Sequence, residues 1–155
     1  MDHEGYTIIL NRLIRTCRQG DYGFRRCAVH VQDAELKSVF AARGAECARA
    51  AADLVRLAQH GGRPADGPTV DRSQRLAAAA PNGWSAVKGM LVGFDDAALL
   101  EECQRAERNA MATYGDALEE SLPEPLRSLL ERQQAAARRS HDCLRKLQLR
   151  ERHGG

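Results

Sequence analysis

Apolar residues recur every three or four positions through the first 60 residues, the spacing that places them on one face of an α-helix. The stripe of the first stretch runs through Leu10, Leu13, Cys17, Gly20, Phe24, Cys27 and Val31. The stripe of the second runs through Leu36, Phe40, Gly44, Cys47, Ala51, Leu54 and Ala58. Asp33 can cap the second stretch by accepting a backbone N–H, and Gly61-Gly62 ends it. The pattern predicts helices over about 4–31 and 33–60, paired as an antiparallel hairpin because their connection is short.

A second pair of stretches with the same period follows beyond residue 94. Asp95 or Asp96 can cap the third helix, and the sequence SLPEP ends it. Pro125 suits the first turn of a fourth helix, where the missing backbone N–H has no hydrogen bond to lose. The pattern predicts helices over about 95–120 and 124–150, which form a second antiparallel hairpin.

The two predicted hairpins are joined by residues 61–94, which contain the loop GGRPADGPT and two short helical candidates, DRSQRLAAAA and WSAVKGMLV. A helix of about 27 residues is ~40 Å long, so a connection of this length can cross the bundle and make the second and third helices parallel. This is the topology of ferritin-like four-helix bundles. The alternative is an up-down bundle in which residues 71–92 fold back locally. The sequence therefore predicts an all-α fold: a single ferritin-like four-helix bundle over residues 1–155, with two antiparallel helical hairpins joined by a long crossover containing short helices.

Composition agrees with a helical bundle and narrows the classes of function. Hydrophobic residues make up 43% and aromatic residues only 5%, which favours helices over sheets. The 23 basic and 21 acidic residues are intermixed, so no nucleic-acid partner is expected. No stretch approaches the ~20 apolar residues of a membrane span, and the start MDHEGYTIILNR lacks the basic residues of a signal peptide. Five cysteines without a C-x-x-C pair favour a reducing, cytoplasmic location. Without a membrane-spanning stretch, no membrane partner is expected.

Polar residues interrupt the apolar stripes of the last two predicted helices. The stripe of the third helix runs through Leu100, Cys103, Glu107, Ala110, Tyr114 and Ala117. Gln133 and His141 lie on the stripe of the fourth helix, within ~6 Å along the axis of the level that Glu107 faces. A buried carboxylate is costly unless it is paired and hydrogen-bonded. The sequence therefore predicts a buried polar cluster in which His141 donates to Glu107, while Gln133 and Tyr114 complete the hydrogen bonds.

A metal site is the alternative interpretation of these positions. Asp21 and Glu46 also come near mid-height, where ferritin-like bundles hold two metal ions between glutamates and two Glu-x-x-His motifs. Neither Glu46 nor Glu107 has a histidine three residues on, so a standard dinuclear site cannot form. What is left is a reduced site for one iron or other divalent ion, held by Asp21, Glu46, Glu107 and His141. The polar cluster is the favoured interpretation, and it requires no cofactor.

Three further residues are weaker candidates. Cys27 and Cys143 have basic neighbours, as a reactive thiol requires, whereas the other cysteines occupy stripe positions as small hydrophobic residues. Trp84 is expected to hold the crossover against the bundle, or else to anchor a partner. The chain contains no Ser-His-Asp order, phosphate-binding glycine loop or zinc-site spacing.

A series of residues in fixed order carries a family resemblance. They are Leu13-Ile14, Gly20-Asp21-Tyr22-Gly23-Phe24, Glu35-Leu36-Lys37, Gly83-Trp84, Lys88-Gly89, Leu100-Glu101-Glu102-Cys103, Glu107, Leu122-Pro123, Gln133 and His141-Asp142. Through them the chain resembles an uncharacterised bacterial family of small ferritin-like four-helix-bundle proteins, catalogued as a domain of unknown function. The resemblance covers about residues 8–148 and implies the ferritin-like bundle with its long crossover, but no activity.

Two hypotheses for the function follow. The favoured one is a non-enzymatic bundle that acts through contacts with an unknown protein partner or as a homodimer, in a setting linked to stress only by analogy. The other is an iron-type metal-binding protein that uses the region of Glu107 and His141.

Overall fold

The structure, a computed structural model, describes residues 3–60 and 94–154 of the chain. This part holds four helices and no strand: α1 (His3–His30), α2 (Ala34–His60), α4 (Asp96–Leu118) and α5 (Glu124–Gly154). The prediction of an all-α four-helix bundle is confirmed to this extent. The largest difference in helix bounds is at the C-terminus, where α5 continues to Gly154 instead of ending near residue 150. Almost all of the predicted crossover, including its short helices and Trp84, lies outside the described residues.

Aspartates fix the beginnings of α2 and α4. Asp33 accepts a hydrogen bond from the backbone N–H of Leu36 (2.9 Å), and Asp95 accepts one from Ala98 (2.8 Å). Asp33 is the N-cap that the sequence predicts, and Asp95 is one of the two that it offers for α4; each satisfies an N–H that the helix leaves free. Asp96 has another role, because its carboxylate accepts the backbone N–H groups of Gln32 (2.8 Å) and Asp33 (3.0 Å). The start of α4 is thereby bound to the turn between α1 and α2.

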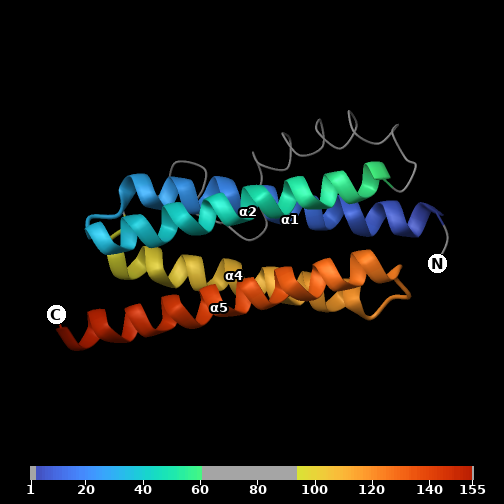
Figure 1. Cartoon of the computed structure of the whole chain (residues 1–155). Coiled ribbons are helices and arrows are strands. Elements are labelled where there is room, and N and C mark those ends of the chain that lie inside the picture. The colour runs from blue at the N-terminus through green and yellow to red at the C-terminus, as the bar shows by residue number, and fades with distance from the viewer. Residues whose placement is uncertain (1–2, 61–93, 155) are drawn as a thin grey trace.

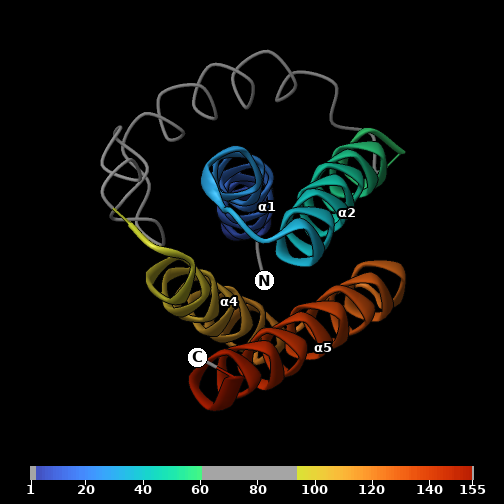
Figure 2. The same ribbon diagram turned by 90° about the vertical axis from the view of Figure 1, so that its left-hand side faces the viewer.

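These contacts set the direction of the helices. α2 and α4 begin side by side at the Asp33–Asp96 contact, and Arg150 near the end of α5 forms an ion pair with Glu35 at the start of α2. Consequently α2 and α4 are parallel, and α1 and α5 run in the opposite direction (Figure 1). In the up-down alternative α2 and α4 would be antiparallel. Seen from the end, the α1–α2 hairpin lies over the α4–α5 hairpin as two layers (Figure 2).

The apolar core is divided into two clusters along the bundle axis. The turn-side cluster lies near the α1–α2 turn and contains Phe24, Cys27, Ala28, Val31, Leu36, Phe40, Cys47, Leu99, Leu100, Cys103, Ala106, Leu144 and Leu147. The terminal-side cluster lies toward the other end and contains Leu10, Leu13, Ile14, Cys17, Ala51, Leu54, Tyr114, Ala117, Leu126 and Leu130. Both clusters draw on all four described helices, so burial of apolar surface holds the two hairpins together at each end.

Small residues let α1 and α2 approach closely at mid-height. A Cβ atom on Gly20 would lie 2.8 Å from the sulfur of Cys47, a distance that real Cβ contacts do not show. A Cβ on Gly44 would lie 3.3 Å from Cγ of Arg25. The predicted stripe positions Gly20 and Gly44 therefore serve helix packing. Among the helices that the structure describes, none is long and apolar enough to cross a membrane.

Candidate functional site

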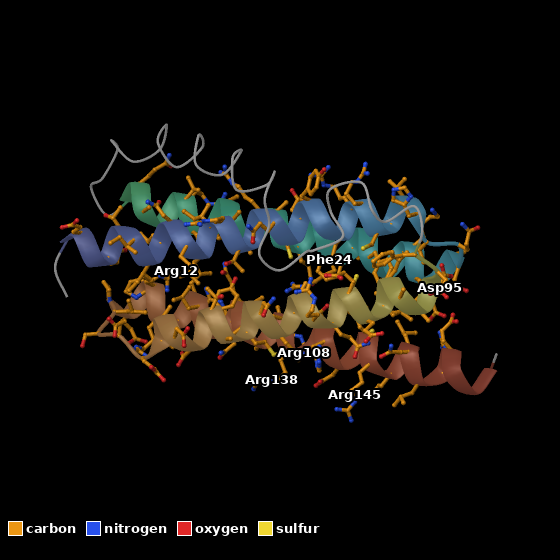
Figure 3. The ribbon with its side chains drawn as sticks, turned by 180° about the vertical axis from the view of Figure 1, so that it is seen from behind. Arg12, Phe24, Asp95, Arg108, Arg138 and Arg145 are labelled. Atoms are coloured by element: carbon orange, nitrogen blue, oxygen red, sulfur yellow. The ribbon has the colours of Figure 1, made fainter. Side chains whose placement is uncertain are left out.

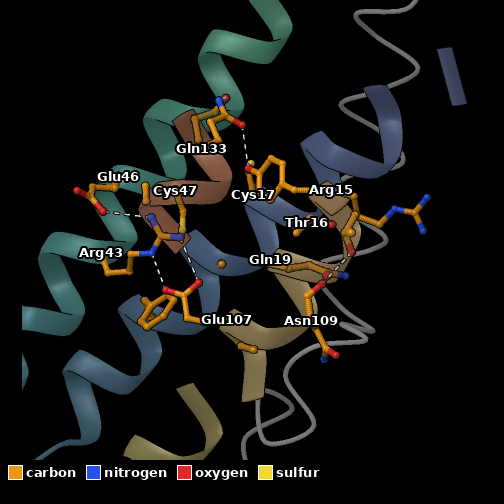
Figure 4. Close-up of a pocket in the computed structure, with 18 of the residues that line it drawn as sticks. Arg15, Thr16, Cys17, Gln19, Arg43, Glu46, Cys47, Glu107, Asn109 and Gln133 are labelled. Carbon is orange, nitrogen blue, oxygen red and sulfur yellow. Dashed lines mark hydrogen bonds and ion pairs between the residues drawn. The ribbon is translucent and has the colours of Figure 1, made fainter. Parts of the chain in front are cut away.

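A cleft of about 850 Å³ opens at mid-height, between the two apolar clusters (Figure 4). All four described helices line it, and its volume is in the range of small-molecule sites. Its lining includes five arginines: Arg12, Arg15, Arg43, Arg49 and Arg132. Polar and charged side chains therefore line the space between the two hairpins at the level that separates the two apolar clusters.

Glu107 of α4 is held by Arg43 of α2, in what we call the ionic link. Nε of Arg43 donates to Oε2 of Glu107 (2.7 Å), and Nη2 donates to Oε1 (3.1 Å). Arg43 also donates through Nη1 to Oε1 of Glu46 (3.1 Å), which is half exposed. The Glu107 side chain is 3% exposed and that of Arg43 is 10% exposed, so the pair is a buried, bidentate bridge between the hairpins.

Burial and pairing act in opposite directions on Arg43. Burial by itself would lower the pKa of its guanidinium, because a charge loses its hydration in the bundle. The hydrogen bonds and the charge of Glu107 more than offset this, and the pKa of Arg43 is raised overall. Arg43 therefore stays charged near pH 7.

The predicted pairing of Glu107 with His141 is wrong. His141 lies next to Asp142 on α5, with Nδ1 3.3 Å from Oδ1, and Glu107 gives both carboxylate oxygens to Arg43. The prediction compared levels only within the second hairpin, whereas the partner of Glu107 comes from the first. α2 and α4 are parallel and begin side by side at Asp33 and Asp96, so residues equally far from these two positions lie at the same level. Arg43 lies ten residues after Asp33, and Glu107 lies eleven residues after Asp96. Counting from the shared start would therefore have predicted their pairing.

A chain of uncharged groups, the neutral link, also crosses between the hairpins. The hydroxyl of Tyr114 donates to Oε1 of Gln133 (2.8 Å), and Nε2 of Gln133 donates to the backbone carbonyl of Ala50 (3.2 Å). The sulfur of Cys17 lies 3.1 Å from the Tyr114 hydroxyl. Since the hydroxyl proton goes to Gln133, the thiol is the donor in that contact. Tyr114 and Gln133, predicted to complete the hydrogen bonds of Glu107, instead bond to each other.

Two thiols and one phenol of the cleft wall are held in their neutral forms. Burial raises the pKa of Cys17 from its ordinary value of 9.0 to about 11, although the contact with the Tyr114 hydroxyl acts the other way. Burial also raises the pKa of Cys47, against the attraction of Arg43, and the pKa of Tyr114. These thiols and this phenol are therefore protonated near pH 7.

The four candidate metal ligands do not come together. Asp21 forms an ion pair with Arg25 one turn on (2.7 Å), on the surface of α1. Glu46 and Glu107 bind Arg43, and His141 lies beside Asp142. Within residues 3–60 and 94–154, no group of three or more His, Cys, Asp and Glu side chains is placed to hold a metal ion. The reduced metal site stays a prediction, without a ligand set in this part of the chain.

The two cysteines proposed as reactive differ in their surroundings. Cys143 is exposed on α5. Cys27 is fully buried, with its sulfur 3.7 Å from that of Cys103, because its position on the apolar stripe outweighs its basic neighbours in sequence. The exposed basic site expected for Cys27 is therefore wrong.

The family model described as "Domain of unknown function (DUF2383)" matches residues 6–120, and the chain belongs to this family. The match includes α2, α4 and nearly all of α1, and it ends before α5. The ionic link lies wholly within it, whereas Gln133 of the neutral link lies beyond it. No curated protein matches the chain.

Proposed function

We propose that this protein is a non-enzymatic binding protein that takes a small organic anion into the mid-height cleft. The observation that carries the proposal is the cleft itself, with its volume of about 850 Å³ and arginines from three helices in its lining. Arg12 and Arg15 come from α1, Arg49 from α2 and Arg132 from α5, and all four are exposed and so accessible to a ligand. Guanidinium groups bind carboxylates and phosphates through paired hydrogen bonds, which favours an anion.

The charges around the cleft favour the same class of ligand. The acids in its lining are largely occupied, because Glu46 and Glu107 bind Arg43, and Asp53 pairs with Arg56. Arg12, Arg15 and Arg49 form no ion pair with any residue in the described part of the chain. Positive charge therefore exceeds negative charge at the opening, although the whole chain carries a net charge of only +2.

The inner wall supports a ligand with an apolar body. Phe24, Ala106 and Ala110 line the cleft beside the polar links, and the first two are buried. An anion that joins an aromatic ring to a carboxylate or sulfonate would place its ring against this wall and its charge among the arginines.

The state of the buried groups favours binding over catalysis. A nucleophile or general base needs a pKa near the working pH. In the cleft, burial raises the pKa values of Cys17 and Cys47, and Glu107 is fixed by two hydrogen bonds from Arg43. Neither thiol is poised to attack a substrate near pH 7, and both oxygens of Glu107 are already bonded to Arg43.

The test uses the fluorescent anion 8-anilinonaphthalene-1-sulfonate, which combines an aromatic body with a sulfonate. The native protein is titrated with this probe, together with a triple variant, Arg12→Gln/Arg49→Gln/Arg132→Gln, that removes one rim charge from each of three helices. We expect saturable binding to the native protein and an affinity lower by roughly tenfold or more in the triple variant, at about 0.5 kcal/mol for each exposed charge.

The matched control is Arg138→Gln/Arg145→Gln, which changes two exposed arginines of α5 outside the cleft. Both project away from the α1–α2 hairpin (Figure 3). The control is expected to bind the probe as the native protein does. Equal affinity in the triple variant, or an equal loss in the control, would contradict binding in the cleft, and circular dichroism checks that every variant is folded.

We also keep the ferritin-like relationship as part of this proposal. The ferritin-like relationship is supported by the parallel course of α2 and α4, which that topology requires. Five features stay predictions from the sequence: a protein partner, a homodimer, a bacterial origin, a cytoplasmic location and a role in stress. A small ligand is favoured over a protein partner because the arginines surround a cleft rather than a flat face.

A further inference from the structure

Two cysteines face each other across the interface between the hairpins. Cys27 of α1 and Cys103 of α4 are both fully buried in the turn-side cluster, and their sulfur atoms are 3.7 Å apart. A disulfide bond needs a separation of about 2.05 Å, so the sulfurs would have to approach by roughly 1.7 Å. Side-chain rotation combined with a small shift of the helices is the kind of movement that this approach requires.

The other three cysteines have different surroundings. The sulfur of Cys17 bonds to the Tyr114 hydroxyl (3.1 Å), and that of Cys47 lies against the backbone of Gly20. Cys143 is exposed on the surface of α5. A sulfur-to-sulfur contact within the described residues is thus a particular property of Cys27 and Cys103.

We propose that Cys27 and Cys103 form a dithiol that a peroxide oxidises to a disulfide, which joins α1 covalently to α4. In the first step one thiolate attacks a peroxide oxygen, the O–O bond breaks, and a sulfenic acid and one water form once a proton is taken up. In the second step the other thiol attacks the sulfenic sulfur, the S–S bond forms, and a second water leaves. Two thiols and one hydrogen peroxide give one disulfide and two waters, with sulfur oxidised and oxygen reduced.

Burial makes this reaction slow in the closed bundle. Neither sulfur is exposed, and burial raises the pKa of Cys103, so that little of the reactive thiolate forms. Peroxide reaches the pair when the hairpins separate locally. The exposed Cys143 reacts sooner, and the experiment therefore starts from the Cys143→Ser protein.

The position of the pair gives the bond two consequences. It closes a loop between residues 76 positions apart, which raises the melting temperature by roughly 5–10 °C. It also lies beside the cleft, since Phe24 and Ala106 each line the cleft three residues from one of the cysteines. The bond would fix the spacing of α1 and α4 at that wall, whether or not the cleft binds an anion.

The test treats Cys143→Ser protein with hydrogen peroxide for increasing times, with and without a low urea concentration that leaves the fold intact. We expect a mass decrease of two hydrogen atoms, a cross-linked pair of peptides that contain Cys27 and Cys103, a higher melting temperature, and reversal by dithiothreitol. Adding Cys27→Ser or Cys103→Ser should abolish the cross-link. Adding Cys17→Ser, a matched change at another buried thiol, should leave it in place.

Two results would overturn the proposal. One is that both thiols stay free, or that the cross-link joins other cysteines, under both sets of conditions. The other concerns protein that is oxidised while unfolded and then refolded with a Cys27–Cys103 bond. If that protein melts below the reduced protein, the native geometry does not accommodate the disulfide.

Discussion

The ionic link and the neutral link join the same two hairpins about two helical turns apart along the bundle axis, and with different chemistry. Arg43 and Glu107 meet as two full charges, whereas Cys17, Tyr114 and Gln133 are joined by hydrogen bonds between uncharged groups. The side chains of both links are largely buried, so water replaces a lost partner poorly. A charge left alone in that setting costs several times more than a neutral group left alone. The comparison teaches that the formal charge of a buried group, more than the number of hydrogen bonds, sets the cost of breaking its link.

The largest effect is expected for Arg43→Met, which leaves the carboxylate of Glu107 buried and unpaired. A buried pair that loses one partner is destabilised by about 3–5 kcal/mol. The free energy of unfolding, measured in urea at pH 7, should fall by this amount. In a bundle of marginal stability a loss of this size also lowers the melting temperature by roughly 10 °C.

The double variant Arg43→Met/Glu107→Leu separates the cost of an unpaired charge from the value of the pair. Apolar residues of similar volume often replace a buried ion pair at no cost. We expect the double variant to regain most of the stability that the single variant loses. A double variant as unstable as Arg43→Met would show that the loss comes from the missing pair itself, and not from the unpaired buried charge.

The next effect concerns pH and belongs to the neutral link. The unfolded Cys17 thiol ionises near its ordinary pKa of 9.0, whereas burial raises the pKa in the folded bundle to about 11. Between pH 9 and 11 the unfolded state has lost a proton that the folded state keeps, so stability that is present below pH 9 falls as the pH rises. Over this pH range the free energy of unfolding of the Cys17→Ser protein should therefore decrease by roughly 2–3 kcal/mol less than that of the native protein.

The measurement is urea unfolding at pH 8, 9, 10 and 11, under reducing conditions, for the native protein and the Cys17→Ser variant. Serine keeps a hydroxyl for Tyr114 but does not ionise in this range. Cys143→Ser is the matched control for the loss of a thiol, because Cys143 is exposed on α5. Parallel profiles for the Cys17→Ser and native proteins would contradict a buried, protonated Cys17.

The sequence predicts the helices well and the contacts of the polar layer poorly, for a physical reason. Periodicity and the caps Asp33 and Asp95 are local signals, and they place each helix to within a few residues. The position of Glu107 on an apolar stripe also correctly indicates burial. Its partner depends on which helices are neighbours and in what direction they run, and that is fixed by distant contacts such as Asp96 with the α1–α2 turn. Arginine in particular reaches across from the edge of a stripe, so Arg43 was not on the predicted inner face.

A smaller effect is expected when the neutral link is cut at its centre by Tyr114→Phe. The change removes the hydroxyl that lies between Cys17 and Gln133 and leaves the Gln133 amide oxygen unsatisfied. The loss for a neutral buried group is about 1–2 kcal/mol. Tyr22→Phe is the control, since Tyr22 is partly buried in the turn-side cluster and no hydrogen bond of its hydroxyl to a described residue is present. A loss for Tyr114→Phe as large as that for Arg43→Met would break the comparison between charged and neutral links.

The smallest effect is expected for Asp21→Asn. This variant tests whether the large effect on stability expected for the ionic link depends on its burial. Asp21 and Arg25 also form two contacts between a carboxylate and a guanidinium, at 2.7 and 3.5 Å, but on the surface of one helix. The Arg25 side chain is 61% exposed, so water and salt screen the pair, and such bridges contribute less than about 0.5 kcal/mol. Urea unfolding at low and high salt should give nearly the same stability for this variant and the native protein. A loss above roughly 1 kcal/mol would mean that the ion pair is strong without burial, and the large effect expected at Arg43 would then need another cause.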